Sequence, residues 1–189
     1  SYQLETTTSL ALDAAAMLNL TQDHLDRYDT MQAYADAKAR IFRRCGTRVV
    51  NRDDPWSLAM AGEGAASFGL GAPSGADEWG LADGELREGT LPILDAAELP
   101  LAGLHNAANA LAAHALCRRA GLPREPLAKA LREFRGLPHR VERVAQAAGV
   151  TFYDDSKGTN VGATVAALDG MREPVVLIAG GDGKGQDFA

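Results

Sequence analysis

The chain has 189 residues, of which 46% are hydrophobic and 23% charged, and its formal net charge is -6. This length allows a hydrophobic core in one domain or in two small ones, and the chain has no basic stripe of the kind that binds nucleic acid. An anionic substrate would therefore need locally placed cations. No apolar run reaches the roughly 20 residues that a membrane helix needs, and no signal peptide is visible, so we expect a cytoplasmic protein.

The two cysteines, Cys45 and Cys117, match no metal-binding or redox spacing. We interpret them as small buried residues in a reducing compartment. The chain opens with what resembles the end of a strand and closes on a glycine-rich loop. We therefore expect a segment of a longer protein.

The first half of the chain predicts a mixed α/β arrangement. The alanine-rich stretch 8–20 predicts a buried helix that runs into a strand. Apolar residues at helical spacing predict a second helix over 31–43, with Thr30 as its N-cap and Gly46 as its C-terminal stop. A short apolar strand is expected at 48–51.

The run Asp53-Asp54-Pro55 predicts a turn before a brief helix. Between residues 62 and 101 glycines are frequent and short runs alternate. The dipeptide Asp83-Gly84 is typical of a type I′ hairpin turn. This segment therefore predicts a small antiparallel edge of a sheet.

Two more helices precede a change of domain. An apolar stripe predicts a helix over 104–119, and another follows, with Pro126 near its first turn and Gly136 at its end. Gly136 is the best boundary, and it divides the chain into domains at 1–135 and 136–189.

Beyond this boundary the pattern predicts a β-α-β arrangement with a parallel sheet. We expect strands at 141–145, 150–153 and 175–179, and a helix at 162–170. The last strand is fully apolar, as buried parallel strands are. The predicted fold class is α/β.

The first group of residues that could carry chemistry is Glu5, Asp23-His24 and Lys38. A carboxylate and an imidazole can hold a divalent metal beside a nucleotide phosphate, and Mg²⁺ favours oxygen ligands and retains water. The simpler interpretation is a solvated helical lysine and a polar surface histidine. The residues by themselves leave both open.

The second group is Asn106 and Asn109, at the start of a predicted helix. Their i, i+3 spacing puts both amides on one face, where carboxamides can donate to and accept from a base edge. The alternative is that Asn106 is an N-cap and Asn109 a tolerated polar residue.

The third group is Pro138-His139-Arg140 followed by the polar run 154–160, which comes after a predicted strand and opens a helix. Loops at this position bind ligands in α/β sheets. Acidic side chains there can bind ribose hydroxyls, Lys157 and the first helical N–H groups favour phosphate or carboxylate, and Arg140, before the preceding strand, could cover phosphates. The alternative is a solvated turn capped by Asp155, Ser156 and Thr159.

The fourth group is the glycine-rich loop 180–185 with Lys184. No Ser or Thr follows this lysine, so the loop is a poor match to a phosphate-binding loop. It could present Lys184 to an anionic substrate, or be a plain glycine turn.

Together and in this order, these pieces resemble the Mur ligase family of peptidoglycan synthesis. The matching stretches are 1–5, 19–27, 34–42, 105–110, 136–142, 155–160 and 180–184. The last three look most like the member that adds D-glutamate. Gly158 stands where that member usually has alanine.

The resemblance implies an ATP-dependent amide-forming ligase of cell-wall synthesis, and hence of cell shape and cell division. ATP would phosphorylate the carboxylate of UDP-N-acetylmuramoyl-L-alanine, and the amine of D-glutamate would attack the acyl phosphate. The implied fold is part of a central ATPase-type α/β domain (1–135) followed by the first part of a Rossmann-like C-terminal domain (136–189).

The resemblance also implies roles for individual residues. The metal ligands for Mg²⁺ would be Glu5, His24 and Lys38, with Lys38 N6-carboxylated. Adenine would contact Asn106 and Asn109, the phosphates Arg140, and the ribose Asp155. The acyl phosphate or the incoming glutamate would be held by Ser156, Lys157, Thr159 and Lys184, so that Lys38, His24 and Lys157 carry the catalytic roles.

Two other functions compete with this one. A sister Mur or folylpolyglutamate-type ligase would add another unit, which the 155–160 motif argues against. The other is a non-catalytic nucleotide-binding fragment, which is favoured because the ATP phosphate loop that the family carries before these motifs is missing from this sequence. We expect a monomer with no nucleic-acid or membrane partner, and little turnover from this segment alone.

Overall fold

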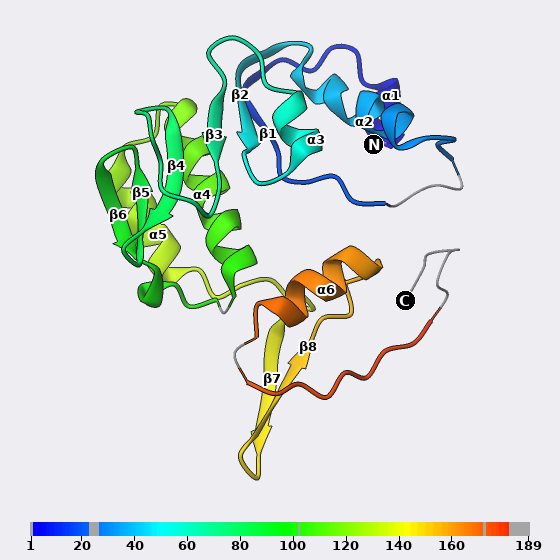
Figure 1. Cartoon of the computed structure of the whole chain (residues 1–189), viewed down its shortest axis with the longest axis vertical. Coiled ribbons are helices and arrows are strands. Elements are labelled where there is room, and N and C mark those ends of the chain that lie inside the picture. The colour runs from blue at the N-terminus through cyan, green and yellow to red at the C-terminus, as the bar shows by residue number, and fades with distance from the viewer. Residues whose placement is uncertain (1, 23–26, 102, 172, 182–189) are drawn as a thin grey trace.

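The computed structural model describes residues 2–22, 27–101, 103–171 and 173–181 (Figure 1). The first elements are α1 (Tyr2–Thr6), β1 (Leu12–Met17), α2 (Met31–Ala39), the 3-10 helix η1 (Arg40–Phe42), β2 (Cys45–Asn51), α3 (Pro55–Ala59) and β3 (Ala66–Phe68). They are followed by β4 (Glu78–Ala82), β5 (Glu85–Glu88), β6 (Leu91–Asp95), the 3-10 helix η2 (Ala96–Glu98), α4 (Leu104–Arg119) and α5 (Arg124–Glu133). The last elements are β7 (Glu142–Ala147), β8 (Val150–Asp154) and α6 (Val161–Asp169).

One six-stranded sheet organises the first 100 residues. Its strands lie in the order β1-β2-β3-β4-β5-β6, and β1 to β4 run parallel. The strands β4, β5 and β6 pair antiparallel, which confirms the predicted antiparallel edge. Asp83 and Gly84 both have positive φ, 53° and 81°, as a type I′ hairpin turn requires.

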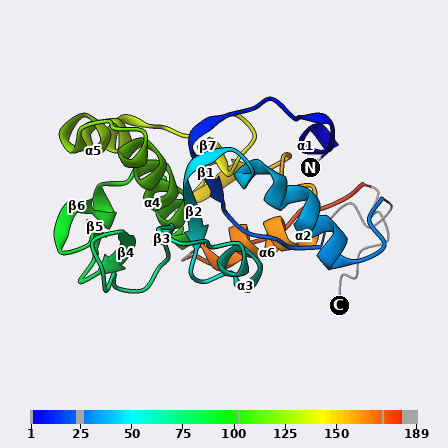
Figure 2. The ribbon, with the colours of Figure 1, turned by 90° about the horizontal axis from the view of Figure 1, so that it is seen from above.

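The parallel part of the sheet is covered on both faces. Val49 and Val50 are neighbours in β2, so their side chains point to opposite faces, yet they are only 0% and 1% exposed. Helix α4 packs on one face, and η1 and α3 contact β2 (Figures 1 and 2). The core under α4 includes Phe68, Trp79 and Leu111. Helix α4 matches its predicted bounds.

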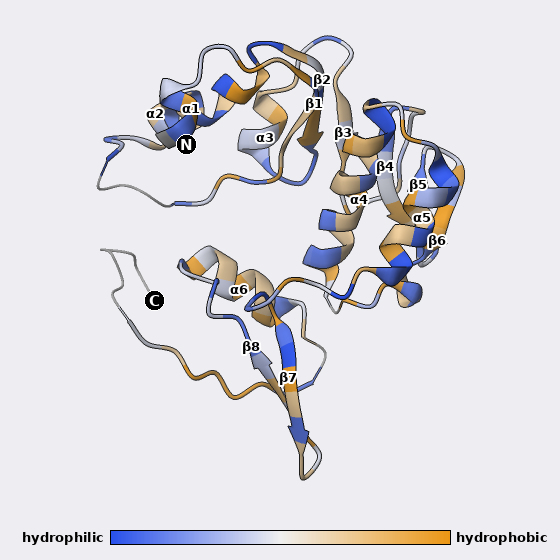
Figure 3. Ribbon diagram, turned by 180° about the vertical axis from the view of Figure 1, so that it is seen from behind, coloured by the Kyte–Doolittle hydropathy of each residue, from blue (hydrophilic) through white to orange (hydrophobic). Residues whose placement is uncertain are grey.

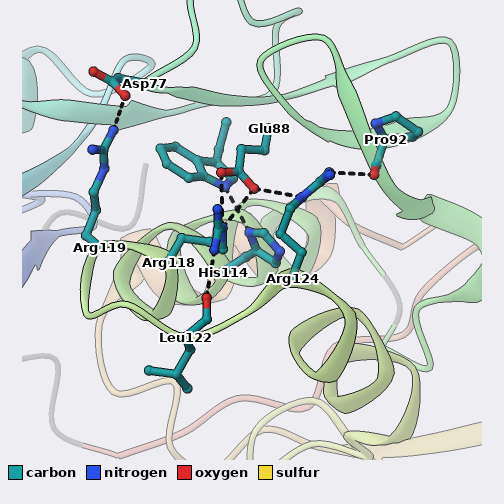
Figure 4. Close-up of polar contacts among 9 residues, drawn as sticks. Asp77, Glu88, Pro92, His114, Arg118, Arg119, Leu122 and Arg124 are labelled. Carbon is teal, nitrogen blue, oxygen red and sulfur yellow. Dashed lines mark hydrogen bonds and ion pairs between the residues drawn. The ribbon is translucent and has the colours of Figure 1, made fainter.

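A polar network lies inside this core (Figure 4). The Trp79 indole donates to Nδ1 of the buried His114, at 2.9 Å. Burial lowers the pKa of His114 to about 4, so the imidazole is neutral at physiological pH. Beside it the Glu88 carboxylate pairs with Arg118, at 3.1 Å, and with Arg124, at 3.0 Å. The network ties α4 and α5 to the antiparallel edge.

The predictions for the first 20 residues are wrong. The stretch 8–20 contains the strand β1 instead of a helix, because pairing with β2 overrides the helix propensity of its alanines. The chain start forms α1 rather than the end of a strand. Gly46 lies within β2 and does not stop a helix. A Cβ there would meet the Asp13 carbonyl oxygen at 2.7 Å, so close backbone approach explains the glycine.

The structure confirms the predicted Thr30 cap and the turn before α3. Thr30 caps α2 by accepting from the Ala33 N–H, although the helix ends at Ala39 and continues as η1. Asp54 caps α3 directly before Pro55, as expected for the predicted turn. Cys45 and Cys117 are free, but both are half-buried rather than buried.

The region after residue 135 is built differently. The strands β7 and β8 form an antiparallel hairpin rather than parallel neighbours, and α6 follows β8 (Figure 1). The strand predicted at 175–179 does not form. This apolar segment, orange in Figure 3, pairs with neither β7 nor β8, and Val176 and Ile178 are 91% and 95% exposed. A parallel strand needs a paired neighbour, and the described residues supply none.

No helix among the described residues combines the length and apolarity needed to cross a lipid bilayer.

Candidate active site

Helix α1 presents Glu5, and Arg40 fixes the end of that helix. The Arg40 guanidinium donates to the carbonyl oxygens of Leu4 and Glu5, at 2.7 and 2.8 Å. These carbonyls belong to the last turn of α1, where backbone acceptors have no partner within the helix. Arg40 thus anchors the backbone that carries Glu5 to the end of α2.

Two buried tyrosines connect Glu5 to Lys38. The Tyr28 hydroxyl donates to Glu5 Oε1, and the Tyr28 ring lies 5.2 Å from the Tyr34 ring, centroid to centroid. On the other side, Lys38 Nζ lies 5.0 Å from the Tyr34 centroid. The structure therefore brings Glu5 and Lys38 into one neighbourhood. His24, the third member of this predicted group, lies outside the described residues.

The Glu5 carboxylate also carries an ion pair with Arg27 on Oε2. The Arg27 guanidinium, and then the Tyr28 hydroxyl, hold the pKa of Glu5 below its usual range. Glu5 is therefore ionised at neutral pH. An ionised, partly exposed carboxylate is the type of ligand that Mg²⁺ accepts, and each of its oxygens retains a lone pair beyond the one in use.

Asn106 and Asn109 lie in the first two turns of α4, as predicted. Asn106 is half-buried and Asn109 is exposed, so the helix offers one partly enclosed and one open carboxamide. Their i, i+3 spacing places both on one side of the helix.

The loop between β8 and α6 holds Asp155 with its carboxylate turned back to the chain. Asp155 Oδ1 accepts from the Val141 N–H at 3.1 Å. The Lys157 N–H donates to the His139 carbonyl at 3.1 Å, while the Lys157 side chain is exposed. Asn160 then caps α6 by accepting from the Ala163 N–H. The other predicted site residues here, Arg140, Ser156 and Thr159, are also exposed.

Gly158 has a physical reason in this loop. A Cβ at Gly158 would lie 2.6 Å from Asp155 Oδ2, so an alanine would require the carboxylate to move.

His139 clamps this loop to the start of β7. The ring Nδ1 of His139 lies 2.7 Å from Asp154 Oδ2, and the backbone N–H of His139 donates to Glu142 Oε2 at 2.8 Å. The hydrogen bond from His139 lowers the pKa of Asp154 to about 2. The ligand-type atoms of the three residues lie within 4.8 Å of one another. Because they bond to each other and to the backbone, we interpret them as a clamp that sets the position of Arg140.

Two contacts bring the predicted groups together. The His105 ring, next to Asn106, lies between Gly103 and Gly170, so that a Cβ on Gly170 would be 2.8 Å from its Nδ1. Burial lowers the pKa of His105, and the negative charge of Asp155 opposes this shift. On the α6 side, a Cβ on Gly162 would lie 3.2 Å from the Thr21 side chain.

The sequence did not single out several residues that hold the site. They are Arg27, Tyr28 and Arg40, which fix Glu5. The position of Arg27 and Tyr28, a few residues after Asp23-His24, was an available signal. Nothing in the pattern marked Arg40. Lys184 lies outside the described residues.

The parallel sheet, its covering helices and the polar loops beside them are features of a known class of proteins. Residues 1–117 match the family model of the Mur ligase middle domain. The chain belongs to the Mur ligase family.

Particular relatives narrow the comparison. UDP-N-acetylmuramoylalanine–D-glutamate ligases of Nitrosospira multiformis and Methylobacillus flagellatus are both 59% identical to the chain over its whole length, and the matched part covers 42% and 43% of those proteins. The chain thus spans about two-fifths of the length of these relatives.

Solved structures agree on the fold. A pseudomurein peptide ligase type C from Methanothermus fervidus superposes with a TM-score of 0.66 at 16% identity, covering 85% of this chain and 41% of that one. MurF from Acinetobacter baumannii gives 0.66 at 24% identity, covering 83% and 37%. At this identity the likeness concerns the fold alone.

Proposed function

We propose that the protein containing this chain is an ATP-dependent ligase that adds D-glutamate to UDP-N-acetylmuramoyl-L-alanine in peptidoglycan precursor synthesis. The observation that carries the proposal is the whole-length identity of 59% to relatives bearing that activity in their name. The structure supports it in two places: Glu5 on α1 and Lys38 on α2 are connected through Tyr28 and Tyr34, and the His105 ring, next to Asn106, lies against Gly170 at the end of α6.

Nucleotide binding falls to residues of both regions. Asn106 and Asn109 would read the adenine edge with their carboxamides, and Asp155 would accept from ribose hydroxyls. Arg140, exposed beside the His139 clamp, would pair with phosphate oxygens. In this assignment the nucleotide bridges α4 and the β8–α6 loop.

Metal binding falls to the first region. Glu5 is an ionised carboxylate, so its chemistry fits Mg²⁺, and His24 and Lys38 complete the proposed set. When bound, the ion would neutralise charge on the transferring phosphoryl group. Lys38, as an ammonium group, suits its place over the Tyr34 ring. Carboxylation would add CO₂ to the neutral amine, release a proton, and replace this cation by an anionic oxygen ligand.

The amide-forming step falls to the exposed groups of the β8–α6 loop. Ser156, Lys157 and Thr159, with Lys184, would hold the acyl phosphate and the carboxylates of D-glutamate. The amine nitrogen forms the new bond to the acyl carbon, and phosphate leaves with the carboxylate oxygen. These residues act by position and charge, because the phosphoryl group needs little covalent chemistry from the protein.

An amino-acid panel tests the proposal. The full-length protein is incubated with ATP, UDP-N-acetylmuramoyl-L-alanine and one amino acid at a time, and phosphate release is measured. We expect release with D-glutamate alone. Release only with another amino acid or a glutamyl unit would assign a sister ligase, and no release with any of them would leave a nucleotide-binding role. A monomeric state and a cytoplasmic location stay predictions.

A further inference from the structure

Two side chains hold the Glu5 carboxylate, and the roles above use neither of them. Tyr28 donates its hydroxyl to Oε1, at 2.5 Å, and Arg27 pairs with Oε2. Both oxygens are therefore engaged, one by a neutral donor and one by a cation. The two partners are adjacent residues in the chain.

Their surroundings differ. Tyr28 is 7% exposed and belongs to a small core with Leu20 and Tyr34, which also contacts it ring to ring at 5.2 Å. Its hydroxyl therefore has little freedom to move. The Arg27 side chain is 49% exposed, so water screens its ion pair with Glu5, and Arg27 also makes a side-chain hydrogen bond with Tyr28.

Their charges differ as well. A phenol hydroxyl orients a carboxylate and leaves its negative charge uncompensated. A guanidinium compensates that charge and competes with any other cation for the same carboxylate. A divalent cation that binds Glu5 would thus retain the Tyr28 contact and weaken or displace the Arg27 contact.

We propose that Tyr28 is a positioning residue that fixes the Glu5 carboxylate for a divalent cation, and that Arg27 is the resident counter-ion which this cation displaces. The proposal rests on the proposed role of Glu5 as a metal ligand. It predicts opposite effects from two neighbouring residues: loss of the Tyr28 hydroxyl weakens metal binding, and loss of the Arg27 charge strengthens it.

The test measures Mn²⁺ binding to the full-length protein without nucleotide, from the electron paramagnetic resonance signal of free Mn²⁺. The variants are Tyr28→Phe and Arg27→Gln, with Glu5→Gln as the reference for a lost ligand. Tyr153→Phe and Arg132→Gln are matched controls, because Tyr153 is exposed on β8 and Arg132 forms an exposed ion pair with Glu98. Thermal melting checks that each variant folds.

We expect Tyr28→Phe to raise the Mn²⁺ dissociation constant about tenfold, as loss of an orienting partner typically does. Arg27→Gln should lower it about three- to fivefold, the range of an exposed ion pair. The two controls should match the parent protein. Because Arg27 is exposed, its variant keeps the proposal testable even where Tyr28→Phe melts early.

Two results would overturn the proposal. One is weaker Mn²⁺ binding by Arg27→Gln, which would make Arg27 a support rather than a competitor. The other is unchanged binding by both variants while Glu5→Gln binds more weakly. If Glu5→Gln itself binds Mn²⁺ like the parent, the metal role of Glu5 in the proposed function fails, and the inference that depends on it falls too. If Tyr28→Phe weakens and Arg27→Gln strengthens Mn²⁺ binding but the protein ligates no D-glutamate, this inference holds and the proposed substrate is wrong.

Discussion

The two regions of the chain bury their apolar residues to very different degrees. Before residue 135 the parallel part of the sheet is covered on both faces, and Phe68, Trp79 and Leu111 are almost inaccessible. After it, none of the described residues is buried, and Phe152 and Val176 stand in solvent. The candidate site draws on both regions. The part around Glu5 and Lys38 rests on a packed core, whereas the β8–α6 loop depends on local hydrogen bonds such as those of His139.

A matched pair of substitutions tests this comparison with the largest expected effect. Phe68→Ala should lower the free energy of unfolding of the 189-residue chain by about 3 to 5 kcal/mol, because it opens a cavity in the core. Phe152→Ala, at a position that is 49% exposed, should cost less than about 1 kcal/mol. Urea unfolding measures both. Equal losses would show that the second region has a core of its own.

The second prediction concerns catalysis by the packed region. Lys38→Ala should lower kcat of the full-length protein by about 100- to 1000-fold, because it removes a charged group from the phosphoryl-transfer site. Short carboxylates added to the assay should restore part of the rate by supplying the missing anionic ligand. Full activity of Lys38→Ala without any added carboxylate would contradict the proposal that Lys38 is carboxylated.

The third prediction is a pH dependence set by His114. Its pKa is lowered from 6.5 to about 4 in the folded chain, so the unfolded chain binds more protons between these values. This contribution to stability is complete above pH 6.5 and is lost as the pH falls through 4, by about 3 kcal/mol in total. His114→Gln can still accept from Trp79 and does not titrate. The difference between the two stability curves, measured by urea unfolding, should show this slope, and parallel curves would contradict it.

The smallest effect belongs to the exposed loop. Asp155→Ala should raise KM for ATP about tenfold, equivalent to about 1.4 kcal/mol, through the lost ribose contact and the freed Val141 N–H. The melting temperature should change little, because the loop packs against no core. Initial rates at varied ATP measure the effect. A large drop in melting temperature would instead make Asp155 a structural residue of the second region.

The sequence predicted what depends on local chemistry. The Asp83-Gly84 turn, the Thr30 cap and the α4 bounds all follow from neighbouring residues, and the structure confirms them. The predictions that were wrong concern segments whose structure depends on pairing with distant strands. The alanines of 8–20 form β1 only because β2 lies beside them, and 175–179 forms no strand because none of the described strands pairs with it.

The site divides in the same way. The resemblance of the motifs to the Mur ligase family named Glu5, Lys38, the asparagine pair and the 155–160 loop. The contacts between them could not be predicted. The Glu5–Tyr28–Tyr34–Lys38 connection and the place of His105 between two glycines exist only in three dimensions.

The most direct test of the account is the fate of an isotopic label. UDP-N-acetylmuramoyl-L-alanine labelled with ¹⁸O in its carboxylate is converted by the full-length protein with ATP and D-glutamate, and the phosphate is analysed by mass spectrometry. The account predicts that one ¹⁸O atom passes from the carboxylate to each phosphate released, because the acyl phosphate breaks at the carbon–oxygen bond. Unlabelled phosphate beside D-glutamate product would contradict the acyl-phosphate mechanism, and no D-glutamate product would contradict the proposed ligase.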